Sequence, residues 1–266
     1  MFDYHIHSDF SADCETPMEK TIERGIDLGL KEICFTEHID YDYPDKSIVF
    51  EFDLEAYDRK IENMKSVYGE KIKIKKGLEI GIQPHLLNTY DELLKKESFD
   101  FVICSMHTTE KKDLHSGAFF KDKTVDEAYS RYYQELLDCV KRFSNFSILG
   151  HIDLVKRYAK NTSNRHFYDI IEQIFKQIIP EGKGIELNTS GFRYGLESGM
   201  PSVDLLRLYK DSGGEILTVG SDSHIESTLG YRLKDSLELL QSIGFKYITT
   251  FKGRKPEFLS IESIIR

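Results

Sequence analysis

Hydrophobic positions along the chain follow two different periods. Short apolar or β-branched runs, which predict strands, alternate with longer stretches that have the spacing of amphipathic helices. The predicted strands cover residues 2–7, 32–36, 72–80, 99–105, 147–150, 184–188, 215–220 and 245–249. The predicted helices cover residues 17–29, 54–68, 85–96, 124–143, 163–179, 201–213 and 233–242. Strands that alternate with helices predict a parallel sheet, and this many units favours an α/β barrel over a doubly wound sheet, which periodicity alone does not exclude.

Local signals add detail at three places. The segment Thr16-Pro17-Met18-Glu19 has the pattern of a capping box with proline at the first helical position, which predicts the start of the first helix. The last predicted strand, 245–249, is expected to be an edge or closing strand. Residues 40–53 and 108–123 are polar, irregular and placed just after strands, so we expect both segments to be active-site loops.

Length and composition limit the class of protein. A chain of 266 residues with 40% hydrophobic content can bury a full core, and we expect residues 1–266 to form a single domain. No run approaches the roughly eighteen apolar residues of a membrane span, and the start Met1-Phe2-Asp3-Tyr4-His5 does not resemble a signal peptide, so we expect a cytoplasmic protein without a membrane partner. The four cysteines lack paired metal spacing and are expected to be buried, reduced thiols: Cys14, Cys34, Cys104 and Cys139.

The formal net charge of −9 narrows the possible partners. Proteins that bind nucleic-acid backbones usually carry a basic surface that displaces condensed counterions. A nucleic-acid partner is therefore not expected, and the oligomeric state stays open. Part of the negative charge is expected to be carboxylates that bind divalent cations.

Histidines gather at the ends of the predicted strands. Six of the nine lie at or just past a strand's carboxyl end: His5, His7, His38, His107, His151 and His224. Carboxylates occupy equivalent places at Glu37, Glu79 and Asp222. The carboxyl ends of barrel strands meet on one face, and mixed imidazole and carboxylate donors suit Zn²⁺, Mn²⁺ or Fe²⁺. The other three histidines, His85, His115 and His166, are assigned to the solvated surface.

Spacing strengthens the metal interpretation. Residues two apart on a strand point to the same side, so His5 and His7 can bind one ion together, and Asp222 and His224 repeat this spacing. A single His-x-His is equally compatible with a polar strand end. Glu79 is flanked by apolar residues and glycine, where an unpaired carboxylate is costly. Taken alone, His107 and His151 are also compatible with hydrogen-bonded core histidines, and Asp13 is a candidate because Thr16 already supplies the helix cap.

These residues carry a family resemblance. Six segments occur in the family's order: His5-x-His7, Thr36-Glu37-His38, Gly77-Leu78-Glu79, Ser105-Met106-His107, Gly150-His151 and Gly220-Ser221-Asp222-Ser223-His224. Together they resemble the polymerase and histidinol phosphatase (PHP) family. The segments Gly150-His151-Ile152-Asp153-Leu154 and Ile185-Glu186-Leu187-Asn188-Thr189-Ser190-Gly191 are similar to its histidinol-phosphatase branch.

The resemblance implies a distorted (β/α)7 barrel with three divalent metal ions. Carried over by position, the first ion would be held by His5, His7, Glu79 and Asp222, the second by Asp13, His38 and His224, and the third by Glu79, His107 and His151. Some family members have histidine at the position of Asp13, so the carboxylate here is expected to lower the preference for zinc and to favour iron or manganese at the second position, and the identity of the ions stays open among zinc, manganese and iron. The implied reaction is hydrolysis of a phosphate monoester, with L-histidinol phosphate of histidine biosynthesis as substrate.

Phosphate transfer requires charge neutralisation and an activated nucleophile. Divalent ions supply a metal-bound hydroxide and stabilise the phosphoryl oxygens. Arg157 and Arg193, each expected at the mouth of the barrel, are candidates for binding the phosphate, with a surface ion pair as the alternative for each. Asp222 or His224 is a candidate for proton transfer.

Two other functions are compatible with such a site. One is another hydrolase on the same barrel: a protein tyrosine phosphatase, a nucleoside phosphatase or an exonuclease. The two arginines favour a terminal monoester, and the acidic charge disfavours a nucleic-acid chain. The other is a non-catalytic metal-binding module, which the complete set of nine ligand positions disfavours.

Overall fold

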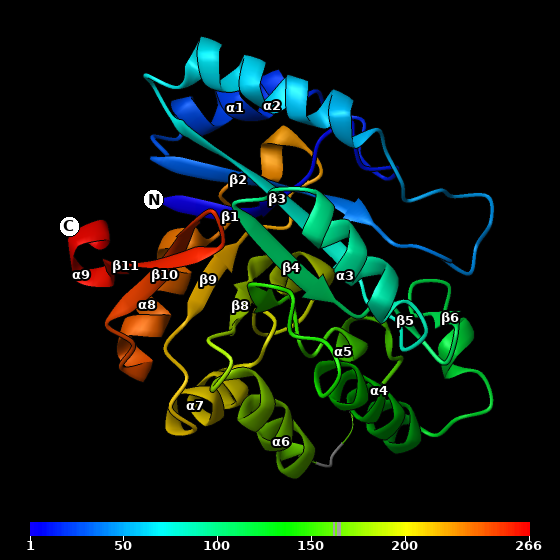
Figure 1. Ribbon diagram of the computed structural model, residues 1–266. Coiled ribbons are helices and arrows are strands. Elements are labelled where there is room, and N and C mark those ends of the chain that lie inside the picture. The colour runs from blue at the N-terminus through cyan, green and yellow to red at the C-terminus, as the bar shows by residue number, and fades with distance from the viewer. Residues whose placement is uncertain (162, 164–165) are drawn as a thin grey trace.

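Seven parallel strands form the centre of the protein, with helices around them (Figure 1). The computed structural model describes residues 1–161, 163 and 166–266. In spatial order the strands are β1 (Phe2–Ile6), β2 (Glu32–Ile39), β3 (Lys73–Gly81), β4 (Phe101–Ser105), β7 (Ile148–Leu149), β8 (Gly184–Asn188) and β9 (Leu217–Gly220). Beyond β9, the backbone N–H of Asp222 donates to His5 of β1 at 2.7 Å, and His7 donates to Ser223 at 2.9 Å. The sheet is therefore a nearly closed barrel, as predicted.

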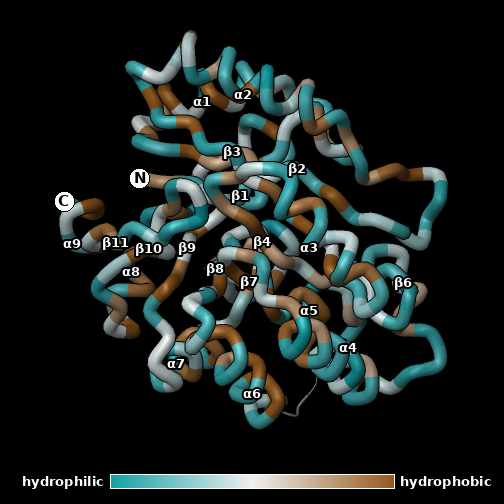
Figure 2. The backbone as a smooth tube through the Cα atoms, viewed as in Figure 1, coloured by the Kyte–Doolittle hydropathy of each residue, from teal (hydrophilic) through white to brown (hydrophobic). Residues whose placement is uncertain are grey.

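The helices follow the predicted order. They are α1 (Met18–Asp27), α2 (Leu54–Tyr68), α3 (Leu87–Lys96), α4 (Val125–Val140), α5 (Val155–Tyr158), α6 (Tyr168–Ile178), α7 (Val203–Asp211), α8 (Leu233–Ile243) and α9 (Ile261–Ile265). Each long helix turns an apolar stripe toward the strands, which Figure 2 shows as brown and teal alternating along α4 and α6. The predicted helix 163–179 includes residues 164–165, which lie outside the described residues.

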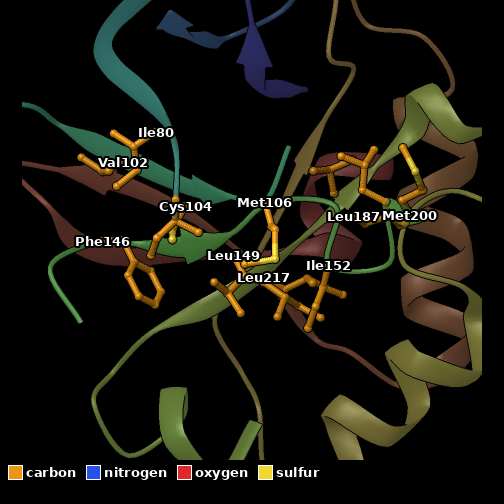
Figure 3. Packing of buried hydrophobic residues seen from close by; sticks show 14 of the residues in the cluster. Ile80, Val102, Cys104, Met106, Phe146, Leu149, Ile152, Leu187, Met200 and Leu217 are labelled. Atoms are coloured by element: carbon orange, nitrogen blue, oxygen red, sulfur yellow. The ribbon is translucent and has the colours of Figure 1, made fainter. Parts of the chain in front are cut away.

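The main core lies between strands and helices. On β4, Val102 and Cys104 pack into this core, whereas Phe101 and Ile103 belong to a smaller second cluster, because successive strand side chains point to opposite faces. Figure 3 shows residues of the strands and of the loops next to them packed together in the main core, among them Val102, Leu149, Leu187 and Leu217. This rigid layer fixes the strand ends from which the functional side chains extend.

The end of the chain differs from the prediction. The predicted edge or closing strand is β10 (Tyr247–Lys252), which pairs antiparallel with the unpredicted β11 (Lys255–Ser260) and stays outside the seven-stranded sheet. Phe251 packs in the second cluster beside Tyr4, and the turn residue Arg254 donates its N–H to Asp100, just before β4. The hairpin therefore lies at the amino-terminal end of the barrel, opposite the functional loops (Figure 1).

Two local predictions also have clear outcomes. Thr16 does not cap α1, whose N-cap is Pro17; the capping box instead occurs at Thr124 and Glu127, at the start of α4. All four cysteines are unpaired and buried, as expected. Among residues 1–161, 163 and 166–266, the helices are too short or too polar to cross a bilayer.

Candidate metal centre

The nine predicted metal ligands meet at the carboxyl ends of the barrel strands. His5, His38 and Glu79 are carried by β1, β2 and β3, whereas the other predicted ligands lie in the segments that follow strands. Seven of the nine line a cavity of about 440 Å³: Asp13, His38, Glu79, His107, His151, Asp222 and His224. His5 and His7 are fully buried in contact with Glu79. Residues up to 219 positions apart in the sequence, from His5 to His224, thus share one site.

The ligand atoms are close enough to share ions. Four overlapping groups have ligand atoms that all lie within 4.8 Å of one another: His7, His38 and His224; His5, His7 and Asp222; His5, Glu79 and His151; and His38, Glu79 and His107. Asp13 joins them, because its Oδ2 lies 3.2 Å from Nε2 of His224 and 3.7 Å from Nε2 of His38. The donors therefore form one continuous cluster.

Glu79 lies at the centre of this cluster and is fully buried. Its Oε2 lies 2.9 Å from Nε2 of His5, 3.5 Å from Nε2 of His7 and 3.3 Å from Nδ1 of His38. Its Oε1 lies 3.3 Å from Nε2 of His107 and 3.1 Å from Nε2 of His151. Burial alone would raise the pKa of Glu79, but the charges of nearby histidines hold the pKa well below its ordinary value. Glu79 is therefore an ionised carboxylate with an oxygen toward each side of the cluster.

Unsatisfied nitrogens in the cluster fit a divalent ion. Nε2 of His7 and Nδ1 of His38 are buried and have no hydrogen-bond partner among the described residues. An unpaired buried polar atom is costly, and cations bound in the cluster would satisfy these nitrogens. Imidazole and carboxylate donors at this density suit zinc or another borderline divalent metal.

The loop before α1 presents Asp13 to the cluster. The Thr16 hydroxyl and the Cys14 thiol both donate to the backbone oxygen of His224, each at 3.0 Å. Thr16 thus connects two parts of the site and does not cap the helix. The argument that selected Asp13, which assumed a Thr16 cap, was therefore wrong, although Asp13 does lie beside His38 and His224.

Both predicted phosphate-binding arginines line the cavity. The Arg157 guanidinium carbon lies 3.3 Å from the centroid of the Tyr194 ring, and Nη1 lies 3.6 Å from Oδ2 of Asp222. Arg193 has an additional structural task, because Nη1 and Nη2 donate to the backbone oxygens of Ser221 and Asp222 at 2.7 and 2.8 Å. Asp222 has φ +53°, a strained region for a residue other than glycine, and these two bonds support that turn.

The pKa values of the two predicted proton-transfer residues are shifted in opposite directions. Burial would raise the pKa of Asp222, but His5, His224 and Arg157 hold the pKa below its ordinary value. Burial would lower the pKa of His224, but its hydrogen bond with Asp13 and the charge of Asp222 raise the pKa.

Two polar residues that line the cavity were not named as site residues, although Asp40 begins a segment predicted to be an active-site loop. His115 was assigned to the solvated surface, but it lines the cavity, where its ring contacts Tyr158 at a centroid distance of 5.7 Å. Asp40 is buried, and its Oδ2 accepts from Nδ1 of His107 at 2.6 Å. The available signal was that Asp40 lies two residues past His38, the spacing that identified the other pairs. The loops 40–53 and 108–123 both contribute to the cavity, as expected.

A model of the PHP domain matches residues 3–190 of the chain. The chain belongs to the PHP domain family. The histidinol-phosphatase of Lactococcus lactis is 34% identical over 258 residues, which cover 95% of each chain. A probable histidinol-phosphatase of Clostridium acetobutylicum is 30% identical over 252 residues, covering 92% of this chain and 95% of the relative.

A crystal structure supports the same relationship. The histidinol phosphate phosphatase of L. lactis, complexed with zinc, L-histidinol and phosphate, has a TM-score of 0.87 against this chain at 34% identity. The match covers 96% of this chain and 98% of that one. The resemblance to the PHP family and the seven-stranded barrel that it implied are therefore both confirmed.

Proposed function

We propose that this chain hydrolyses L-histidinol phosphate to L-histidinol and inorganic phosphate, the dephosphorylation step of histidine biosynthesis. One observation carries the proposal: nine metal-type donors and two arginines meet at a single cavity in a chain that is 34% identical to a histidinol-phosphatase. The cavity volume of about 440 Å³ suits a small monoester.

Three divalent ions are proposed to occupy the cluster. The first position would use His5, His7, Glu79 and Asp222, the second Asp13, His38 and His224, and the third Glu79, His107 and His151. Zinc is the proposed metal, because the donors are mainly imidazoles and the L. lactis structure contains zinc. When bound, such ions lower the pKa of coordinated water and neutralise charge on phosphoryl oxygens.

Arg157 and Arg193 are proposed to bind the phosphate. Arg157 stacks on Tyr194, which fixes the plane of its guanidinium at the cavity wall. Arg193 uses one N–H of each terminal nitrogen for the turn at Asp222, and each terminal nitrogen retains a second N–H. The two cations would compensate the charge of the dianionic monoester.

Proton transfer to the leaving alkoxide is assigned to His224, with Asp222 as the alternative. His224 lies at the cavity wall with its side chain 28% exposed, whereas that of Asp222 is only 8% exposed. In the metal-free site the pKa of His224 is raised and that of Asp222 is depressed, but both are also proposed metal ligands, and a ring nitrogen that binds a metal carries no proton. With Nε2 of His224 toward Asp13 at the second position, Nδ1 is the one ring nitrogen left to carry a proton, whereas an ionised Asp222 has none to donate, so His224 is the assigned donor.

The remaining cavity wall suits the organic part of the substrate. Asp40, Tyr43, His115 and Tyr158 are among the residues that line the cavity. L-histidinol carries a cationic amine and an imidazole, which carboxylate, hydroxyl and aromatic groups can bind.

A panel of small monoesters tests the proposal. Phosphate release is measured on L-histidinol phosphate, phosphotyrosine and a nucleoside monophosphate with zinc-loaded protein. The proposal predicts that kcat/KM for L-histidinol phosphate exceeds the others by at least about a hundredfold, which corresponds to roughly 2.7 kcal/mol. A preference for phosphotyrosine or the nucleotide would show that L-histidinol phosphate is not the main substrate. No phosphate release from any of the three would favour a non-catalytic metal-binding module.

A further inference from the structure

A polar segment of β8 and the turn after it lies behind the metal cluster. Glu186, Asn188 and Ser190 are all fully buried, although charged and amide side chains are rare in a barrel interior. Glu186 and Asn188 are two residues apart on one strand and therefore point to the same side. None of the three has a role in the site described above.

Glu186 connects two predicted metal ligands. Its Oε1 accepts from Nδ1 of His5 at 2.7 Å, and its Oε2 accepts from the backbone N–H of His151 at 3.1 Å. The side chains of Glu186 and His5 are at most 1% exposed. A Cβ atom at Gly220 would lie 2.5 Å from Oε1 of Glu186 and 2.3 Å from Cβ of His5, so glycine is required for this close approach.

Asn188 and Ser190 extend the network to a third ligand. Nδ2 of Asn188 lies 3.2 Å from Oε2 of Glu186 and 3.4 Å from Oδ2 of Asp222. The Ser190 hydroxyl lies 3.0 Å from the same Oδ2 of Asp222. Asp222 is thereby held through one oxygen, while its other oxygen, Oδ1, faces Nε2 of His5 and His7 at 3.8 and 3.6 Å.

We propose that Glu186 is a positioning residue that fixes His5 as an Nε2 metal ligand, with Asn188 and Ser190 fixing Asp222 beside it. A proton on Nδ1 of His5, donated to Glu186, leaves the Nε2 lone pair free toward Oε2 of Glu79, 2.9 Å away. A carboxylate behind a ligating imidazole sets the tautomer and raises the basicity of the ligand. The segment that resembled the histidinol-phosphatase branch therefore supports the first ion position.

The alternative is that Glu186 only satisfies a buried backbone N–H. Glu186→Gln distinguishes the two, because glutamine keeps the size but loses the charge and turns an amide donor toward either His5 or the donors of His151 and Asn188. The matched control is Glu32→Gln. Glu32 is also a buried carboxylate on a barrel strand, but it accepts from the Tyr4 hydroxyl at the amino-terminal end, away from the metal cluster.

The experiment compares zinc affinity by competition with a chromophoric chelator, together with the visible absorption spectrum of Co²⁺-substituted protein. Glu186→Gln is expected to weaken one zinc position by about 10- to 100-fold and to change the Co²⁺ spectrum. Glu32→Gln is expected to lower thermal stability while leaving both readouts unchanged. Wild-type zinc affinity in Glu186→Gln, or an equal loss in both variants, would overturn the proposal.

The inference rests on the metal centre of the proposed function, and the two can fail separately. Absence of zinc binding by the wild type would refute the metal centre, whereas the ratio between variant and wild type tests only Glu186. Should Glu186→Gln not fold, ¹H–¹⁵N correlation spectra of zinc-loaded wild type report the His5 tautomer directly. A ring protonated at Nδ1 and ligated through Nε2 is expected, and ligation through Nδ1 would overturn the proposal.

Discussion

Replacement of Glu79 by glutamine is expected to remove two of the three proposed metal ions together. Glu79 is fully buried and faces five imidazole rings at distances between 2.9 and 3.5 Å. Its carboxylate is ionised, because the neighbouring histidines depress its pKa despite burial. Glu79→Gln therefore keeps the shape of the side chain but removes one negative charge from the centre of the cluster.

The size of the effect follows from Coulomb's law. A unit charge pair about 4 Å apart is worth about 4 kcal/mol at an effective dielectric constant of about 20. Even half of that, about 2 kcal/mol, corresponds to a roughly 30-fold loss of affinity at each position that Glu79 contacts. The proposed second position, with Asp13, His38 and His224, does not use Glu79 and is expected to keep its ion.

The assay is metal content by mass spectrometry after dialysis against a chelator of graded concentration. Asp153→Asn is the matched control, because Asp153 is a buried carboxylate that also follows a barrel strand but pairs with Lys156 at 2.7 Å and accepts from the backbone of Ser202. One ion retained in Glu79→Gln and three in the control is the expected result. Three ions bound to Glu79→Gln at wild-type affinity would refute the assignment of Glu79 to both the first and the third metal position.

Three further outcomes are expected. Arg157→Lys should raise KM for L-histidinol phosphate about tenfold or more at unchanged metal content, since a charge-assisted hydrogen bond is worth about 1.5–3 kcal/mol; steady-state kinetics at wild-type KM would contradict this. Gly220→Ala should destabilise the protein by about 1–3 kcal/mol through overpacking against His5 and Glu186, measured by urea unfolding, and unchanged stability would be inconsistent with that contact. Burial lowers the pKa of His5 and of His107, but neighbouring carboxylates raise both well above their ordinary value in metal-free protein. The stabilisation from these two protonated histidines is complete below the unfolded pKa of about 6.5 and is lost as pH rises through the folded pKa. Over that rise in pH, the metal-free protein should become less stable in unfolding titrations, while zinc affinity should increase because the rings lose their protons. Opposite slopes in the two titrations would contradict this prediction.

The fold was largely predictable because the hydrophobic pattern is clear where strands are buried on both faces. The bounds of β8 and α2 agree with the predicted 184–188 and 54–68. The strand β10 was predicted as 245–249, but its partner β11 was not predictable, since Lys255-Pro256-Glu257 has neither apolar alternation nor a strand-like composition. Its pairing depends on the turn at Gly253 and Arg254, both with positive φ, and on the contact of Phe251 with the barrel end.

The site was predictable to the extent that strand geometry determines it. Spacing of two residues identified His5 with His7, because such pairs share one side of an extended chain. Asp222 and His224 also meet in the site, but through a turn in which Asp222 has φ +53°, so the extended-chain reasoning does not apply to that pair. Glu186 and Asp40 also lie two residues from functional neighbours, but they accept hydrogen bonds from the predicted metal ligands His5 and His107, and only the tertiary contacts show these roles. His115 was misassigned because sequence does not show how a loop folds over a cavity.

The decisive measurement is phosphate release from L-histidinol phosphate by protein that has been stripped of metal and then titrated with zinc. We predict no measurable release without metal and a rate that rises to its maximum as the third equivalent of zinc binds to each chain. Full activity of the stripped protein, or no activity of protein that carries three equivalents of zinc, would contradict a metal-dependent histidinol phosphate phosphatase.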